Sequence, residues 1–67
     1  MSKRYTPQYI EQILINNDFK FVSQKGSHKK YFKDNLTVIV PFSKKEVPIG
    51  TFCSILKQSK LSKDDFK

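Results

Sequence analysis

Four apolar residues near the start of the chain recur at the spacing of a helix, at Tyr9, Ile10, Ile13 and Leu14. Positions three and four apart lie on one face of an α-helix, so this pattern predicts a helix from about residue 7 to residue 15 or 16. Thr6 suits the N-cap, and Pro7 suits the first helical position, where its missing N–H costs nothing. One face of this helix is therefore expected to pack on a core.

A second helical pattern lies near the other end of the chain, with apolar residues at Ile49, Phe52, Cys53 and Leu56. It predicts a helix from about Pro48 to Ser59. Cys53 is chemically able to act as a nucleophile, but its apolar neighbours favour packing in the core. Ser62 and Asp65 have the spacing of a capping box for a last turn, from which Phe66 would fold back on the core.

Between the helices the pattern changes to the alternation of β-strands. We expect strands at 19–24, 27–33 and 36–40, joined by turns at 25–26 and 34–35. Phe19 and Phe21 share one face of the first strand, and Leu36, Val38 and Val40 share one face of the third. Pro41 ends the third strand because it has no N–H to donate.

The second strand has two possible buried faces. Tyr31 shares a face with Lys29, whereas Phe32 shares the opposite face with His28 and Lys30. Burial of Tyr31 would leave His28 and Lys30 on the open face and Phe32 free to stack on a base. Burial of Phe32 would take His28 into the core with it.

The order of elements predicts a two-layer α+β fold, αβββα, with both helices on one face of a three-stranded antiparallel sheet. This arrangement is similar to a double-stranded-RNA-binding domain. The 67 residues are enough for one domain, which we expect to span residues 1–67. A domain of this size buries only about 60% of its unfolded surface, so its stability is expected to be marginal unless a partner helps.

Charge adds the expectation of a polyanionic partner. The chain has 13 Lys and Arg against 6 Asp and Glu, a net charge of +7. Nucleic acid is the leading candidate for that partner. A membrane surface would attract the same charge, but the apolar runs are short and neither helix resembles a basic membrane anchor. The first residues show no apolar leader, so we expect a cytoplasmic protein.

His28 is the only histidine in the chain and the first candidate for chemistry. A neutral imidazole near pH 7 can take or give a proton. The cations around it would hold a polyanion beside the ring, and Ser27 can donate a hydrogen bond to a phosphate oxygen. The residues expected to bind RNA are Lys25, Gly26, Ser27, Lys29, Lys30, Lys44 and Lys45.

No metal site is expected. Cys53 is the sole cysteine, which leaves neither a disulfide framework nor a zinc-ligand spacing with His28. The acidic residues are scattered over predicted helix, turn and tail, whereas a two-metal nuclease gathers its carboxylates. RNA carries its own nucleophile, the 2′-hydroxyl, so one acid or base and a few cations suffice to cleave it. The alternatives are a small basic module that binds RNA without cutting it, and a subunit whose open sheet face docks another protein.

Five short runs follow one another in this chain: Gln24-Lys25-Gly26-Ser27-His28 with Tyr31, Val38-Ile39-Val40-Pro41, Lys45-Glu46, Gly50-Thr51-Phe52 and Ile55-Leu56-Lys57-Gln58. Their order and spacing resemble the HicA family of toxin ribonucleases over nearly the whole chain. The chain departs from the family pattern at two places. Phe42-Ser43 stands where many members have a second histidine, and Ser59-Lys60 stands where many have a small residue and a glycine.

The resemblance implies a toxin of a toxin–antitoxin system that cleaves mRNA as an endoribonuclease without a metal or cofactor, with His28 as general acid or base. It also implies a HicB-like antitoxin whose acidic surface covers His28. Tyr31 coincides with the aromatic position of the family motif, which favours Tyr31 as the inward residue. The departure at Phe42-Ser43 argues against a mechanism that needs two histidines.

Overall fold

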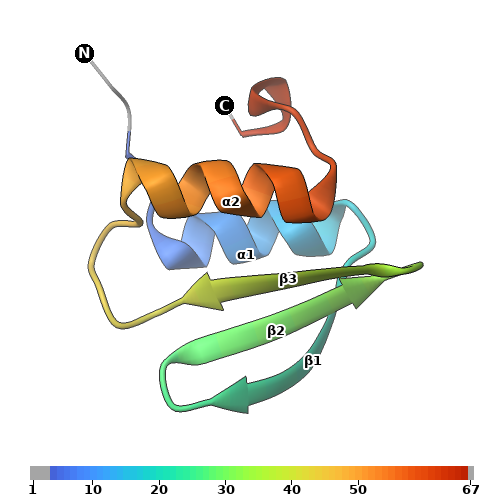
Figure 1. The fold of residues 1–67 in the computed structure, drawn as a ribbon, viewed down its shortest axis with the longest axis horizontal. Helices are drawn as coiled ribbons and strands as arrows, with labels where there is room; N and C mark the ends of the chain where they lie inside the picture. The colour runs from blue at the N-terminus through green and yellow to red at the C-terminus, as the bar shows by residue number, and fades with distance from the viewer. Residues whose placement is uncertain (1–3, 67) are drawn as a thin grey trace.

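The computed structural model of the protein describes residues 4–66. Its elements are α1 (Pro7–Asn16), β1 (Lys20–Lys25), β2 (His28–Lys33), β3 (Leu36–Pro41), α2 (Ile49–Ser59) and the 3-10 turn η1 (Lys63–Asp65). The strands form an antiparallel sheet in the order β1-β2-β3, and both helices cover the same face of it (Figure 1). The predicted two-layer α+β fold is confirmed. No helix within residues 4–66 is long and apolar enough to cross a membrane.

The start of α1 is fixed by its predicted cap. Thr6 Oγ1 accepts a hydrogen bond of 3.1 Å from the N–H of Tyr9, and Pro7 is the first helical residue. Ile10 and Leu14 are fully buried on the face toward the sheet. Because the helix ends before Asp18, which has a left-handed φ of 72°, the chain turns back immediately into β1.

The predicted buried face of α2 is partly wrong. Phe52 and Ile55 are buried and Leu56 packs against the core, but Cys53 is exposed and Ile49 is 45% exposed. The observed stripe continues to Ser59, which is 2% exposed, so the helix is rotated by about 60° from the predicted orientation. Both sets of residues have helical spacing, and the position of β3 beneath the helix selects between them. Pro48 is the N-cap and not the first helical residue.

The second strand buries Tyr31. Its side chain is fully buried, whereas Phe32 is 44% exposed on the opposite face. In β3, Val38 and Val40 are likewise fully buried. The preference for Tyr31 as the inward residue is therefore confirmed, and the alternative with Phe32 in the core is wrong. The buried apolar core comprises Ile10, Leu14, Phe19, Tyr31, Val38, Val40, Val47, Phe52, Ile55 and Phe66.

A bulge at Val22 interrupts β1. Phe21 pairs with Tyr31 and Ser23 pairs with Lys30, so Val22 has no partner on β2. Before the bulge Phe21 lies on the helix side, where its ring centroid is 6.0 Å from that of Tyr31, although half of Phe21 stays exposed. The extra residue reverses the alternation, because successive side chains of a strand point to opposite faces. Ser23 and Lys25 consequently lie on the open face of the sheet.

The chain end returns to the core as predicted. The N–H of Ser62 donates to the Asp65 carboxylate over 3.0 Å, which closes the capping box. Phe66 is 1% exposed, with its ring centroid 5.1 Å from that of Phe52. The Tyr5 hydroxyl donates to the carbonyl of Phe66, so the segment after α2 is tied to the residues before α1.

Candidate functional site

His28 is the first residue of β2 and lies between two other strands. Its register partners are Lys25 at the end of β1 and Pro41 at the end of β3. The turn before it uses Gly26 with a left-handed φ of 61°, a conformation that costs glycine little. The N–H of Phe42 donates to the Ser27 carbonyl over 2.6 Å, which ties the start of β2 to the end of β3. The backbone around the exposed His28 side chain is therefore fixed from both sides.

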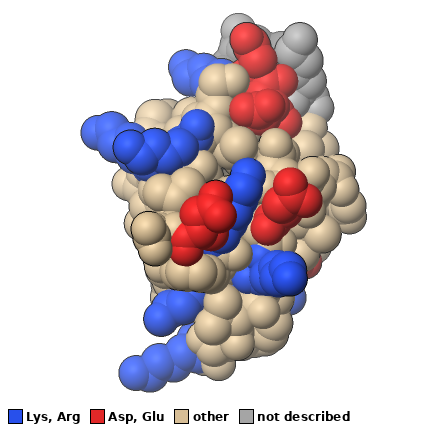
Figure 2. All heavy atoms as spheres, turned by 90° about the vertical axis from the view of Figure 1, so that its right-hand side faces the viewer, with Lys and Arg blue, Asp and Glu red and all other residues tan. Residues whose placement is uncertain are grey.

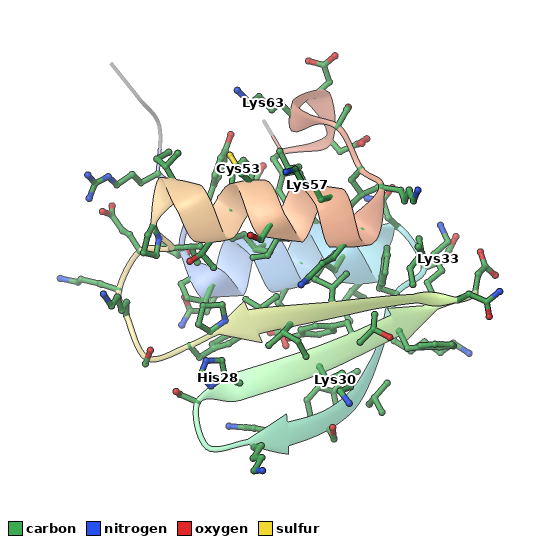
Figure 3. The ribbon with its side chains drawn as sticks, in the orientation of Figure 1. His28, Lys30, Lys33, Cys53, Lys57 and Lys63 are labelled. Carbon is green, nitrogen blue, oxygen red and sulfur yellow. The ribbon has the colours of Figure 1, made fainter. Side chains whose placement is uncertain are left out.

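On the open face of the sheet, His28 shares a shallow hollow with two lysines. This sheet hollow, of about 440 Å³, is lined by Ser23, Lys25, His28, Lys30 and Ile39. Lys30 follows His28 by two residues on β2 and therefore lies on the same face (Figure 3). The bulge in β1 brings Lys25 to this face as well. The structure thus brings together three of the predicted site residues.

A second hollow, which we call the α2 groove, begins at His28 and lies between β3 and α2. It measures about 320 Å³ and is lined by His28, Ile39, Pro41, Ser43, Lys44, Pro48, Thr51, Ser54, Ile55 and Gln58. Lys44 enters it from the loop that joins β3 to α2. Since His28 lines both hollows, its ring lies where they meet, with Lys25 and Lys30 in one and Lys44 in the other.

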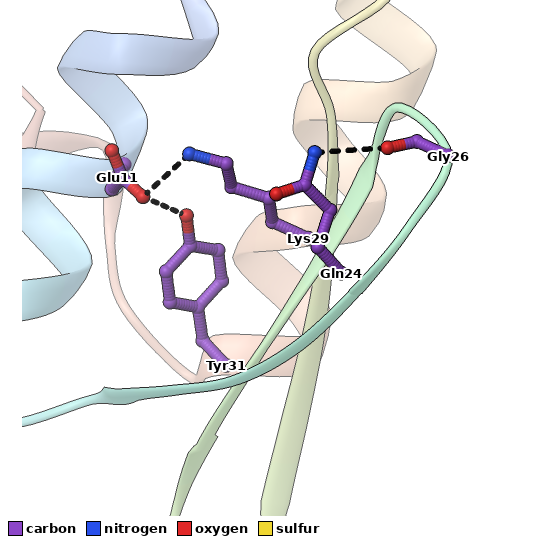
Figure 4. Close-up of polar contacts among 5 residues, drawn as sticks. All are labelled: Glu11, Gln24, Gly26, Lys29 and Tyr31. Carbon is purple, nitrogen blue, oxygen red and sulfur yellow. Dashed lines mark hydrogen bonds and ion pairs between the residues drawn. The ribbon is translucent and has the colours of Figure 1, made fainter.

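Lys29 belongs to the other face of β2. Its Nζ lies 3.5 Å from Glu11 Oε2 on α1 (Figure 4). The same Nζ lies 4.2 Å from the centroid of the Phe42 ring. The Tyr31 hydroxyl donates a hydrogen bond to the same carboxylate oxygen. The structure therefore does not bring the Lys29 ammonium together with His28, and Glu11 compensates its charge.

Tyr31 has a strongly raised pKa. Burial is the main cause, and the hydrogen bond to Glu11 and the charge of that carboxylate act in the same direction. Each of these effects disfavours the phenolate. Tyr31 accordingly stays a neutral hydrogen-bond donor, a structural role that fixes Glu11 between β2 and α1.

The remaining predicted residues lie around the turn and the loop. Gly26 and Ser27 form the β1–β2 turn, and the Gln24 side-chain amide donates to the Gly26 carbonyl over 2.9 Å (Figure 4). Lys45 is exposed in the β3–α2 loop and lines neither hollow. Among residues 4–66, no three His, Cys, Asp or Glu side chains gather as ligands for a metal ion.

Acidic side chains are prominent at the end of the sheet remote from His28. Asp34 lies in the β2–β3 turn with a φ of 55°, at the other end of β2. Figure 2 views the molecule from that end and shows carboxylates interspersed with cations. Near His28, by contrast, both hollows contain lysine, and neither is lined by a carboxylate. The ring therefore faces an electropositive surface.

Sequence reasoning missed the polar lining of the α2 groove. Thr51, Ser54 and Gln58 are three and four residues apart on α2, so they share one face of the helix. The same spacing in the sequence predicts a polar stripe on α2 beside its buried apolar stripe. Without the position of β3, however, nothing linked that stripe to His28.

The comparisons with known proteins decide the family. A family model described as the HicA toxin of bacterial toxin–antitoxin systems matches residues 8–61. The chain belongs to the HicA toxin family. A search of curated proteins found no match. As a HicA toxin, this chain is one half of a pair whose other member is an antitoxin, and the matched region contains His28 and every residue that lines the two hollows.

Proposed function

We propose that this HicA toxin is an mRNA-cleaving endoribonuclease that acts in the cytoplasm and uses His28 as its general acid or base. The observation that carries the proposal is the position of an exposed imidazole where two lysine-lined hollows meet. A phosphodiester at this point would have its charge balanced by Lys25 and Lys30 on one side and Lys44 on the other. The chain of RNA on each side of the scissile phosphate would occupy the two hollows.

The reaction would be a transesterification within the RNA. His28 removes the proton of the 2′-hydroxyl, the 2′-oxygen forms a bond to phosphorus, and the bond from phosphorus to the 5′-oxygen breaks. The 5′-oxygen takes up a proton from water or from Lys30. The nucleophile is part of the substrate, so the protein supplies a base, alignment and positive charge. The products are a 2′,3′-cyclic phosphate and a 5′-hydroxyl.

His28→Ala tests this proposal on purified RNA. We expect cleavage to fall by about 10² to 10⁴, the usual contribution of one general acid or base. RNA affinity and melting temperature should stay close to wild type, because the ring is exposed and does not belong to the core. RNA methylated at the 2′-oxygen should bind and remain uncut. If wild-type protein shifts RNA without shortening it, the chain is a non-catalytic RNA-binding module.

The antitoxin of this pair is proposed to be HicB-like and to cover His28 with an acidic surface. The net charge of +7 and the lysines beside His28 would attract such a surface. An antitoxin that binds the folded toxin but not the unfolded chain would raise the melting temperature of the toxin. By covering His28 it would also suppress cleavage. A complex that cuts RNA at the rate of the free toxin would refute masking.

A further inference from the structure

We propose that the α2 groove holds one nucleobase of the RNA, adjacent to the scissile phosphate at His28, and that it selects uracil or guanine over adenine or cytosine. This inference rests on the proposed function, because RNA must lie at His28 for its base to reach the groove. It adds a base-recognition site to the proton-transfer site.

The shape of the groove suits a flat aromatic ring. Its volume of about 320 Å³ is at the lower end of ordinary small-ligand pockets, which span about 300 to 1,000 Å³. Ile39 and Pro41 of β3 line it on one side, and Pro48 and Ile55 line it from the loop and α2. Apolar surfaces of this kind can contact the faces of a base and leave its edge for polar groups.

Gln58 presents hydrogen-bond donors to the groove. Its side-chain oxygen accepts a hydrogen bond of 3.2 Å from the N–H of Ile39. A backbone N–H can only donate, so this contact fixes the amide with its oxygen toward β3. The Nε2 group keeps two donors, which have no protein partner within residues 4–66. A base edge bound here must offer Gln58 an acceptor.

Ser54 supplies the complementary acceptor one helical turn earlier. Its hydroxyl donates to the carbonyl of Gly50 over 3.3 Å, which directs its proton toward the helix backbone and leaves its lone pairs available. Residues four apart on a helix are neighbours, with about 5 to 6 Å between their Cβ atoms. The groove therefore offers a donor beside an acceptor.

All four bases carry an acceptor beside a donor, so discrimination depends on which end of the base faces His28. Gln58 contacts Ile39, two residues before Pro41, the register partner of His28, and Ser54 lies one turn nearer the start of α2. With the phosphate at His28 the sugar end of the nucleotide faces His28, so the ring nitrogen meets Ser54 and the outer group of the base meets Gln58, and this order distinguishes the bases.

Uracil and guanine present a carbonyl oxygen beside a ring N–H, which matches a donor beside an acceptor. Cytosine and adenine present an amino group beside a bare ring nitrogen, which is the reverse order. A mismatched base would place donor against donor and acceptor against acceptor, and would leave those groups unpaired.

The test measures binding to three RNA octamers methylated at every 2′-oxygen, made of uridine, adenosine or cytidine, by fluorescence anisotropy. We expect wild-type protein to bind the uridine octamer about tenfold more tightly than the other two, since a good base contact discriminates by about 1 to 3 kcal/mol. Gln58→Glu keeps an oxygen for Ile39 and removes both donors. In this variant the preference for uridine should disappear.

Gln8→Glu is the charge-matched control, because Gln8 is exposed on α1 and lines neither hollow. This substitution should lower the affinity for all three octamers by one common factor and keep the order of their affinities. Ser54→Ala is the second variant, at an exposed position, and should also reduce the preference for uridine. It serves as the test if Gln58→Glu fails to fold.

Two results would overturn the proposal: wild-type protein that binds all three octamers alike, or variants at Gln58 and Ser54 that keep the wild-type order. If the toxin cuts RNA but gives either of these two results, the nuclease proposal stands and the base-recognition site is refuted. Toxin that discriminates among the octamers but leaves unmodified RNA intact keeps the base site and loses the nuclease proposal. The methylated octamers cannot be cleaved by the proposed route, so the two outcomes stay separate.

Discussion

Among single residues, Glu11 shapes the site without lining it. Its carboxylate accepts a hydrogen bond from Tyr31 and pairs with Lys29, so two side chains of β2 are held by one residue of α1. Lys29 is adjacent to His28 in the chain. Its ion pair with Glu11 therefore holds the start of β2 against α1. At this end of β2, the lysine left to contact the proposed RNA substrate is Lys30 on the open face.

Tyr31→Phe tests this cluster at alkaline pH. Folding raises the pKa of Tyr31 above its ordinary value of 10.0, whereas the unfolded chain releases that proton near pH 10. The contribution of protonated Tyr31 to the free energy of unfolding is fully present below about pH 10. At higher pH it falls by about 1.4 kcal/mol per pH unit. The free energy of unfolding of wild-type protein should therefore fall more steeply above pH 10 than that of the variant.

Urea denaturation at a series of pH values provides the measurement. The lysines titrate in the same range, but they are common to both proteins and cancel in the difference. Near neutral pH the variant should be less stable by about 1 kcal/mol, the usual net worth of a hydrogen bond. Parallel pH curves would contradict the assignment of the alkaline effect to Tyr31.

Sequence reasoning predicted the inward Tyr31, with Lys30 beside His28 on the open face, but not the face on which Lys25 lies. On β2, strict alternation places Lys29 and Lys30 on opposite faces, and the structure agrees. On β1 the same rule fails, because the bulge at Val22 reverses the faces after Phe21. Nothing local marks that bulge, since it forms only when β1 pairs with β2. The role of Glu11 depends on α1 docking on the sheet, which is also a long-range event.

At the scale of elements, α2 ends with a lysine in a backbone conformation that glycine adopts more easily. Lys60 has a left-handed φ of 62°, and its N–H donates to the Leu56 carbonyl over 2.9 Å to close the helix. This conformation costs an ordinary L-residue about 1 to 2 kcal/mol, and glycine is the usual solution. The resemblance to the family pattern had already indicated a glycine at this point.

Lys60→Gly is therefore expected to stabilise the protein. The gain should be about 0.5 to 1 kcal/mol, less than the full conformational cost because glycine also loses more entropy on folding. A change of 1 kcal/mol moves the melting temperature of such a domain by about 4 to 8 °C. Lys57→Gly makes the same chemical change inside α2 and should destabilise by about 0.5 to 1 kcal/mol. Thermal unfolding that shifts both variants in the same direction would refute this explanation.

The helices show where local pattern is sufficient. Thr6 and Pro7 define the start of α1 through groups within one turn, and the Ser62–Asp65 box defines η1 in the same way. The buried face of α2 was predicted less well. Ile49 and Cys53 have the right spacing for a core stripe, yet Ile55 and Ser59 form it, because helical periodicity fixes a stripe and leaves its direction to the packing partner.

At the scale of the whole molecule, charge should govern how tightly RNA binds. If Lys25, Lys30 and Lys44 each contact one phosphate, the logarithm of affinity should fall with the logarithm of salt concentration with a slope of about −2, since each contact contributes about −0.7 on a single strand. Lys30→Ala should make the slope shallower by about 0.7 for every RNA sequence. Binding to 2′-O-methylated RNA at several salt concentrations measures this without cleavage.

Lys63→Ala is the matched control for that experiment. Lys63 belongs to η1, beyond the helix layer from the sheet hollow (Figure 3). Its removal lowers the net charge equally but should leave the slope close to the wild-type value. Equal effects of the two substitutions would mean that RNA responds to overall charge and not to the lysines beside His28.

The bulge in β1 also affects how this toxin behaves toward other copies of itself. An outer strand with a regular row of unpaired N–H and C=O groups is a template for strand addition and aggregation. Here the row on β1 is broken at Val22, with Lys20 and Lys25 at its two ends, and on β3 the Gln58 side chain occupies the N–H of Ile39. Deleting Val22 would restore regular pairing, leave Lys25 opposite His28, and create an edge open to fibre growth. One irregular residue thus protects the edge of β1 in a toxin that lacks its antitoxin, and the Val22 deletion should aggregate more readily than wild-type protein.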